Sequence, residues 1–167
     1  MRVSTCDDPQ SLSWGGAAWS GWHDFDQAHS ASLIPPTSGL YRFRARGDTG
    51  LLYIGESGAR KGRRSRLGAL ARGTMRHSPD YYLHWRDAGL PRRPHRSHYA
   101  APYLRQCRDA GCRIEVSWSI GEFADDGERL CTEDRLIGLH QQVTGWDPPV
   151  QHGGRGMDAY LTRHMTG

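Results

Sequence analysis

Two short runs decide the fold: Gly39-Leu-Tyr-Arg-Phe-Arg-Ala45 and Leu51-Leu-Tyr-Ile-Gly55. Both are rich in aliphatic and aromatic residues, and the segment between them, Arg46-Gly-Asp-Thr-Gly50, contains the glycine and aspartate that suit a turn. The pattern predicts a β-hairpin. In an antiparallel hairpin Tyr41 and Tyr53 can face the same surface, so we expect two phenols to lie close together.

The chain after the hairpin predicts helices and one further strand. Apolar residues at helical spacing predict a basic helix over residues 60–72, ended by Gly73. We expect a helix over 103–110, a strand over 112–120 and an amphipathic helix from about 128 to 144, followed by a tail that is mainly loop. These elements predict a small α/β domain, with a mixed three-stranded sheet flanked by helices.

Residues 1–36 differ in composition from the rest of the chain, because three tryptophans stand among small residues. This composition predicts an N-terminal extension that packs onto the core through its aromatic side chains, since it is too aromatic for a disordered tail. Residues 37–167 then form the main domain, with a basic loop insertion at about 73–100.

The length of 167 residues fits one compact domain. No run approaches the roughly 20 apolar residues of a membrane span, and the N-terminus has acidic residues where a signal peptide is apolar. We therefore expect a soluble, cytoplasmic protein with no membrane partner. The four cysteines form no C-x-x-C pair, so neither a disulfide framework nor a zinc ribbon is indicated.

Positive charge is concentrated in one stretch, although the net charge is only +4. Between Arg60 and Arg105 twelve basic residues face two acidic ones, and nearly all of the twelve are arginines, whose planar guanidinium can hold a phosphate by two hydrogen bonds. Such segregation favours a nucleic-acid partner, while an ordinary solvated arginine face is the alternative. The candidate nucleic-acid-binding residues are Arg60, Lys61, Arg63, Arg64, Arg72 and Arg76.

The tripeptides Gly39-Leu-Tyr41 and Tyr53-Ile-Gly55 resemble the paired motifs of the GIY-YIG nuclease superfamily, with leucine in place of the usual isoleucine in the first. The resemblance extends to the Arg66-Leu67 pair in the next predicted helix and to Glu133, which precedes apolar residues in a later one. It covers residues 38 to about 155. It implies a GIY-YIG-like fold and metal-dependent hydrolysis of DNA phosphodiester bonds.

The same resemblance implies that Tyr41 is the general base or positions the water, with Tyr53 holding phosphate or water. A phenol has an ordinary pKa near 10, so a base at neutral pH needs nearby positive charge to lower it. Arg66 can supply fixed charge to the phosphate, and Glu133 can anchor Mg²⁺ or Mn²⁺ through oxygen. On a helix Glu133 shares a face with Leu136, so its carboxylate needs a partner, either a metal or an arginine.

Three features depart from the family pattern. Leu70 stands where many members carry a residue that assists the base, so His98 or Lys61 is the candidate substitute. Gln151 stands near the point where members often carry an asparagine, so it is a candidate for that amide. The catalytic arginine itself has alternatives. They are Arg63 and Arg64, because the loop before the helix does not fix its register.

The compactness of the chain resembles the stand-alone restriction endonucleases of the family. We therefore expect a site-specific endonuclease with a restriction or host-defence role that acts on double-stranded DNA, with a homodimer as a possible assembly. One alternative is a repair-type nuclease that recognises structured or modified DNA. Another is a catalytically silent nucleic-acid-binding module that keeps the fold.

Overall fold

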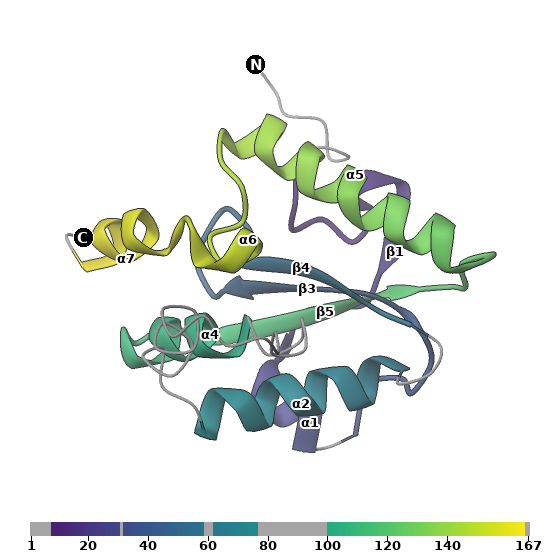
Figure 1. Cartoon of the computed structure of the whole chain (residues 1–167), viewed down its shortest axis with the longest axis horizontal. Coiled ribbons are helices and arrows are strands. Elements are labelled where there is room, and N and C mark those ends of the chain that lie inside the picture. The colour runs from purple at the N-terminus through teal and green to yellow at the C-terminus, as the bar shows by residue number, and fades with distance from the viewer. Residues whose placement is uncertain (1–7, 31, 59–61, 77–99, 166–167) are drawn as a thin grey trace, which may run out of the picture.

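A computed structural model describes residues 8–30, 32–58, 62–76 and 100–165. A β-sheet lies between helix α5 on one face and helices α1, α2 and α4 on the other (Figure 1). Its strands are β1 (Ala18–Trp19), β2 (His23–Asp24), β3 (Gly39–Ala45), β4 (Tyr53–Ser57) and β5 (Ile114–Ile120). The helices are α1 (Phe25–Ser30), α2 (Gly62–Arg76), α4 (Ala100–Asp109), α5 (Asp126–Thr144), α6 (Gln151–Gly154) and α7 (Met157–Met165), with a 3-10 turn at Trp14–Gly16.

The predicted hairpin is confirmed. Strands β3 and β4 pair antiparallel, with Tyr41 opposite Gly55 and Phe43 opposite Tyr53. Because residues opposite one another share a face, the two tyrosines lie on the same side of the sheet, with their ring centroids 6.2 Å apart.

The α/β class is confirmed, but the sheet is neither mixed nor three-stranded. Among the described residues it has five strands in the order β1-β5-β3-β4, with β2 also paired to β5, and every pairing is antiparallel. A helical crossover between strands usually gives parallel neighbours. Here the chain leaves β4, continues through α2 and α4, and reaches β5 on the far side of β3. Strand β5 therefore pairs with β3, which runs in the opposite direction.

The two faces of the sheet bury separate apolar clusters. The cluster on the side of α2 and α4 includes Phe43, Leu67 and Leu104, whereas the cluster on the side of α5 includes Ile54 and Leu136. Alternate residues of β3 and β4 supply the two clusters, as expected for strands covered on both faces.

The predicted helices 103–110 and 128–144 and the strand 112–120 correspond to α4, α5 and β5. Two predictions were wrong. Helix α2 continues through Gly73 to Arg76, because a single interior glycine costs only about 1 kcal/mol. The expected loop tail forms α6 and α7, and Met157 and Tyr160 of α7 are buried in the core. Helices this short show no clear apolar repeat in the sequence, and they are stabilised instead by packing against the core.

The N-terminal segment packs on the sheet around Arg42. The guanidinium carbon of this buried residue lies 4.3 Å from the ring centroid of Trp19 and 4.6 Å from that of Trp22. Its nitrogens donate hydrogen bonds to the carbonyl oxygens of Pro9, at 2.6 Å, and Ser11, at 2.9 Å. Since β1 and β2 also pair with β5, the described part of this segment completes the sheet.

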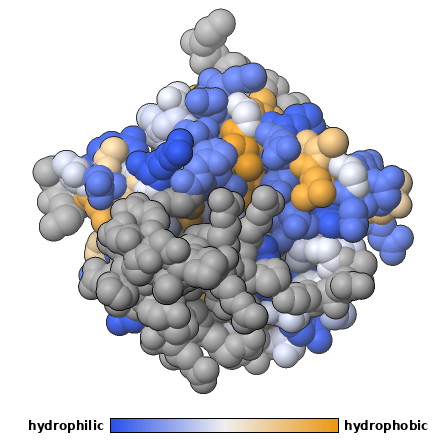
Figure 2. Space-filling view, in the orientation of Figure 1, coloured by the Kyte–Doolittle hydropathy of each residue, from blue (hydrophilic) through white to orange (hydrophobic). Residues whose placement is uncertain are grey.

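The face in Figure 2 is mainly hydrophilic over α5, with a few hydrophobic side chains between charged ones. Exposed apolar residues of α5 include Leu130 and Val143. None of the helices in the described part of the chain has the length and apolar character needed to cross a membrane.

Candidate functional site

Gly55 forms the floor beneath the two predicted phenols. A Cβ atom at this position would lie 2.6 Å from the hydroxyl oxygen of Tyr41 and 2.6 Å from Cε1 of Tyr53. The Tyr41 ring therefore crosses from β3 over the backbone of β4, and only glycine leaves room for both rings. Because β4 is the outer strand on this side of the sheet, groups from both faces can meet past its edge.

Helix α2 brings Arg66 to the same site. Its start is fixed by Arg63, which is only 4% exposed and donates hydrogen bonds to both oxygens of Thr37 and to Ser119. Gly62 has φ +61, and a Cβ there would lie 1.6 Å from the carbonyl oxygen of Pro36. Arg63 is thus an internal brace of the fold, and Arg66 stands one turn further along the helix.

Helix α5 contributes Glu133. The residue shares a helix face with the buried Leu136 and His140, as its position in the sequence predicts. Burial raises the pKa of Glu133 to about 7, and the negative charges of Glu56 and Asp134 add to this shift. The positive charges of Arg66 and Arg129 oppose it. A carboxyl group with a near-neutral pKa is characteristic of functional sites.

Tyr41 is buried and Tyr53 is partly buried, and both lie within reach of the same charges. Burial raises the pKa of Tyr41 to about 12; Arg66 lowers it, while Glu133 raises it. The pKa of Tyr53 is raised well above its ordinary value, mainly by burial and then by Tyr41 and Glu133. The structure therefore brings together Tyr41, Tyr53, Arg66 and Glu133. The direction of the Tyr41 shift is opposite to the one a general base requires.

Two polar atoms in this site are buried without a hydrogen-bond partner in the described part of the chain. They are the hydroxyl oxygen of Tyr41 and Nε of Arg66. Most buried polar atoms in proteins are satisfied, so such exceptions need an explanation. The guanidinium of Arg66 lies close enough to the Tyr41 hydroxyl to lower the pKa of that phenol, so one bound oxyanion or water beside both groups would satisfy the two atoms.

Sequence reasoning missed two charged residues of the site. Arg129 is buried on α5, and its Nε lies 2.8 Å from Oε2 of Glu56 and its Nη1 2.6 Å from Oδ1 of Asp126. Weak signals were present, because Glu56 directly follows the second tripeptide and Arg129 precedes Glu133 by one helical turn. Only the folded chain shows that these segments meet.

Other predicted residues lie outside this description. Arg60, Lys61 and His98 are not among the described residues. Arg72 and Arg76 belong to α2, but their side chains are outside the described part. The predicted loop insertion at 73–100 is likewise described only at its two ends, which are helical.

Three further predicted positions have other partners. Arg64 is exposed at the surface of α2, although its Nε donates a hydrogen bond to the carbonyl oxygen of Ile34 at 2.8 Å. Leu70 is a buried core residue. The Gln151 amide accepts a hydrogen bond from the backbone N–H of Ile54 at 3.1 Å and donates one to its carbonyl oxygen at 3.0 Å. The amide of Gln151 is therefore bound to β4.

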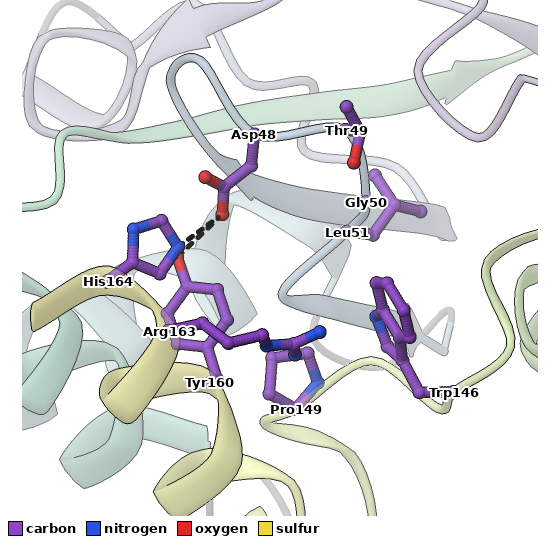
Figure 3. A pocket seen from close by; sticks show the side chains of 9 residues that line it. All are labelled: Asp48, Thr49, Gly50, Leu51, Trp146, Pro149, Tyr160, Arg163 and His164. Carbon is purple, nitrogen blue, oxygen red and sulfur yellow. Dashed lines mark hydrogen bonds and ion pairs between the residues drawn. The ribbon is translucent and has the colours of Figure 1, made fainter. Parts of the chain in front are cut away.

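A separate pocket lies at the turn end of the hairpin, between that turn and α7 (Figure 3). Its volume is about 200 Å³. Oδ2 of Asp48 accepts a hydrogen bond from the hydroxyl of Tyr160 at 2.7 Å and lies 3.1 Å from Nε2 of His164. The guanidinium carbon of Arg163 lies 4.4 Å from the ring centroid of Trp146. Among the described residues predicted to be catalytic, none lines this pocket.

The site at Gly55 thus combines two hydroxyls, a guanidinium and a carboxyl group of near-neutral pKa. This set can bind an oxyanion through the guanidinium and hydroxyls and a cation through the carboxylate. Comparisons of the chain with protein-family models, with curated proteins and with solved structures find no match.

Proposed function

We propose that the protein is a metal-dependent endonuclease of the GIY-YIG type, which hydrolyses phosphodiester bonds of double-stranded DNA in a restriction or host-defence role. The observation that supports this proposal is the meeting of Tyr41, Tyr53, Arg66 and Glu133 in one partly buried site. These residues come from four different elements, β3, β4, α2 and α5, so only the tertiary fold brings them together. A phosphate group would satisfy the donors that lack a partner there.

The residues fit a divalent cation. The side chain of Glu133 has no hydrogen bond or ion pair in the described part of the chain, so its carboxylate is available to a cation. The described residues contain no group of three or more His, Cys, Asp or Glu side chains that could hold a metal ion by themselves. Mg²⁺ commonly binds through one or two carboxylates, with water and substrate phosphates as its other ligands. When bound, such an ion polarises the scissile phosphate and stabilises the departing alkoxide.

Each side chain has a role that follows from its chemistry. The guanidinium of Arg66 compensates the negative charge that grows on the phosphate oxygens. The raised pKa of Tyr41 keeps its phenol protonated at neutral pH. In the free protein Tyr41 is therefore a hydrogen-bond donor that positions water or a phosphate oxygen, and Tyr53 has the same character.

The basic character of the chain supports DNA as the polyanion. The predicted positive stretch begins just before α2, the helix that carries Arg66. Arg64 of this helix is exposed, and Arg72 follows further along it. Such arginines contact the phosphates of DNA and make the affinity depend on salt. The logarithm of the binding constant falls by roughly 0.9 per phosphate contact for each ten-fold rise in salt concentration.

Cleavage of plasmid and modified phage DNA by the full chain, with Mg²⁺, Mn²⁺ or EDTA, tests the proposal. The variant Glu133→Ala should bind DNA but lose cleavage, and Arg66→Ala should lose about 10² to 10³ in rate. Asp134→Ala is the matched control, because it removes an exposed carboxylate from the adjacent position of α5. This control should cleave as the parent does.

The outcomes separate the remaining alternatives. Discrete metal-dependent fragments from plasmid DNA would support a site-specific endonuclease, whereas cleavage only of branched or modified DNA would support the repair-type nuclease. DNA binding without cleavage in any metal would favour the catalytically silent module. Full activity of Glu133→Ala would show that the proposed site is wrong.

A further inference from the structure

Glu56 is a charged residue of the site with no role in the mechanism proposed above. It follows Gly55 on β4 and pairs with Leu40, so its side chain lies on the α5 face of the sheet. Oε2 of Glu56 accepts a hydrogen bond from Nε of Arg129 at 2.8 Å, while Oε1 has no bond in the described part of the chain. Oε2 is therefore held by Arg129, whereas Oε1 can bind a ligand.

Arg129 places Glu56 next to Glu133. Arg129 and Glu133 are four residues apart on α5, so their side chains lie on the same helix face one turn from each other. The Arg129 side chain is 5% exposed and is held by Glu56 and by Asp126. Glu133 itself has no bond of this kind. Two carboxylates, of which only one is neutralised, therefore stand at the same end of the site.

A second observation indicates that this end of the site takes a ligand. The hydroxyl of Tyr41 lies over Gly55, the residue that precedes Glu56, on the α2 side of the sheet, and it is buried beside Arg66 without a well-formed hydrogen bond. Nε of Arg66 is buried without one as well. Unpartnered donors next to an excess of carboxylate are the arrangement expected where a phosphate oxygen and a cation bind together.

We propose that Glu56 is a second carboxylate ligand of the divalent cation, shared with Glu133 and held in place by Arg129. The inference rests on the proposed function and adds to it a residue from the hairpin. The cation would then have one carboxylate ligand from β4 and one from α5, whereas Glu133 alone would provide a ligand from the helix only. The alternative role of Glu56 is a purely structural partner of Arg129.

Binding of Mn²⁺ to the full chain without DNA, measured by calorimetry and by the electron spin resonance of free Mn²⁺, tests this role. The variants Glu56→Gln and Glu133→Gln should each weaken Mn²⁺ binding by about ten-fold or more. The control is Asp134→Asn, which removes one negative charge beside Glu133 without removing a proposed ligand. Its affinity should stay within about two-fold of the parent.

Glu56→Gln removes one of the two carboxylate partners of Arg129 and could destabilise the fold. A second variant therefore separates loss of a metal ligand from loss of folding. The double variant Glu56→Gln with Arg129→Met removes both partners of the buried pair, which is usually better tolerated than removing one. It should fold, as judged by circular dichroism, and still bind Mn²⁺ weakly. Retention of parental Mn²⁺ affinity in this folded double variant would overturn the proposal.

Failure of the inference is distinguishable from failure of the proposed function. If Glu133→Gln loses Mn²⁺ while Glu56→Gln behaves as Asp134→Asn does, Glu56 is only structural and the endonuclease proposal stands. If all variants lose affinity equally, the effect is one of overall charge and the inference fails. If the parent chain binds no Mn²⁺ and cleaves no DNA, both proposals fail.

Discussion

Glu133 is held in an environment that disfavours its own charge. Its partial burial raises its pKa to about 7, and the nearby carboxylates of Glu56 and Asp134 add to this shift against the opposing effect of two arginines. A residue selected only for stability would not be kept in this condition, because burying a carboxylate without a partner costs free energy. The stability of the fold should therefore report on this residue directly.

The first prediction concerns Glu133→Gln in the absence of divalent cations. The folded pKa of about 7 lies above the ordinary value of 4.5, so ionisation of Glu133 lowers the free energy of unfolding as pH rises between these values. The cost is absent below about pH 4 and complete above about pH 7. Glu133→Gln should thus be more stable than the parent at pH 8, by on the order of 2 kcal/mol.

Urea unfolding in EDTA across this pH range measures the effect. The two proteins should converge in stability toward pH 4. The exposed neighbour Asp134 gives the comparison, since Asp134→Asn should change the free energy of unfolding much less. Equal stability of Glu133→Gln and the parent at pH 8 would contradict the buried, charged state of this carboxylate.

The second prediction concerns Gly55→Ala. The added methyl group would stand 2.6 Å from atoms of both Tyr41 and Tyr53, so the rings must move or the strands must separate. Overpacking of this kind typically costs about 1 to 3 kcal/mol. Urea unfolding should show this loss, and cleavage activity should fall with it because the phenols are displaced.

A matched glycine separates steric conflict from the general effect of adding a methyl group. Gly138 lies inside α5, and a Cβ there would meet nothing within 4 Å. Gly138→Ala should therefore stabilise the protein by up to about 1 kcal/mol, because alanine is the better helix former. A stable and active Gly55→Ala variant would show that the two phenols are not placed by this glycine.

Residue-level prediction from the sequence worked where chemistry is local. The two tripeptides place Tyr41 and Tyr53 on one face of a hairpin, and helical spacing puts Glu133 beside Leu136. The Glu56–Arg129 pair could not be derived in this way, since it joins residues 73 positions apart. The shift of the Tyr41 pKa was also inaccessible, because it depends chiefly on burial.

At the scale of elements, the placement of α2 depends on its first turn. Arg63 connects the helix to Thr37 and to Ser119 at the end of β5, and Gly62 lets the chain pass tightly beside Pro36. Arg63, which the sequence suggests as a DNA-binding residue, is therefore buried and bonded inside the fold. Position in the sequence does not distinguish it from Arg64, since only tertiary contacts decide which arginine turns inward.

The third prediction concerns Arg63→Ala. The change removes a buried guanidinium and its hydrogen bonds to the Thr37 hydroxyl and to the carbonyl oxygen of Ser119. The free energy of unfolding should fall by roughly 2 to 4 kcal/mol, as measured by urea denaturation. Arg155→Ala, at an exposed position, should stay within about 0.5 kcal/mol of the parent. A loss of DNA affinity in Arg63→Ala without a loss of stability would favour direct contact with DNA.

Element boundaries were predicted least well where elements are short. Strands β1 and β2 have two residues each, which is too few for an alternating pattern. Helices α6 and α7 contain or adjoin several glycines. Helix α6 is held by the bonds of Gln151 to β4, and α7 by the packing of Met157 and Tyr160. Long elements with clear ends were predicted well, as α5 shows by ending at Gly145 in the left-handed region.

At the scale of the whole molecule, Arg42 joins the N-terminal segment to the sheet. Its guanidinium is stacked between tryptophans and donates to two backbone carbonyls of the segment. An apolar residue could fill this space but could not satisfy the carbonyl oxygens of Pro9 and Ser11. The segment and the sheet should therefore unfold as one cooperative unit.

The fourth prediction is that Arg42→Lys destabilises the whole chain, although it keeps the charge. An ammonium group cannot reproduce the planar stacking and the two separate hydrogen bonds. We expect a loss of about 2 kcal/mol or more in the free energy of unfolding, with a shift of tryptophan fluorescence toward longer wavelength. Arg46→Lys is the control, since the Arg46 side chain is 61% exposed. A parental unfolding curve for Arg42→Lys would show that the segment is held by other contacts.

The bonds between Gln151 and Ile54 bear on how copies of the chain can assemble. An uncovered edge strand invites other chains to add to the sheet, by ordered dimerisation or by aggregation. Here the N–H of Val150 donates to the carbonyl oxygen of Leu52, and the Gln151 amide occupies both backbone groups of Ile54. The tail thus covers the outer edge of β4 at Leu52 and Ile54, so this part of the edge is closed to strand addition by a second copy of the chain.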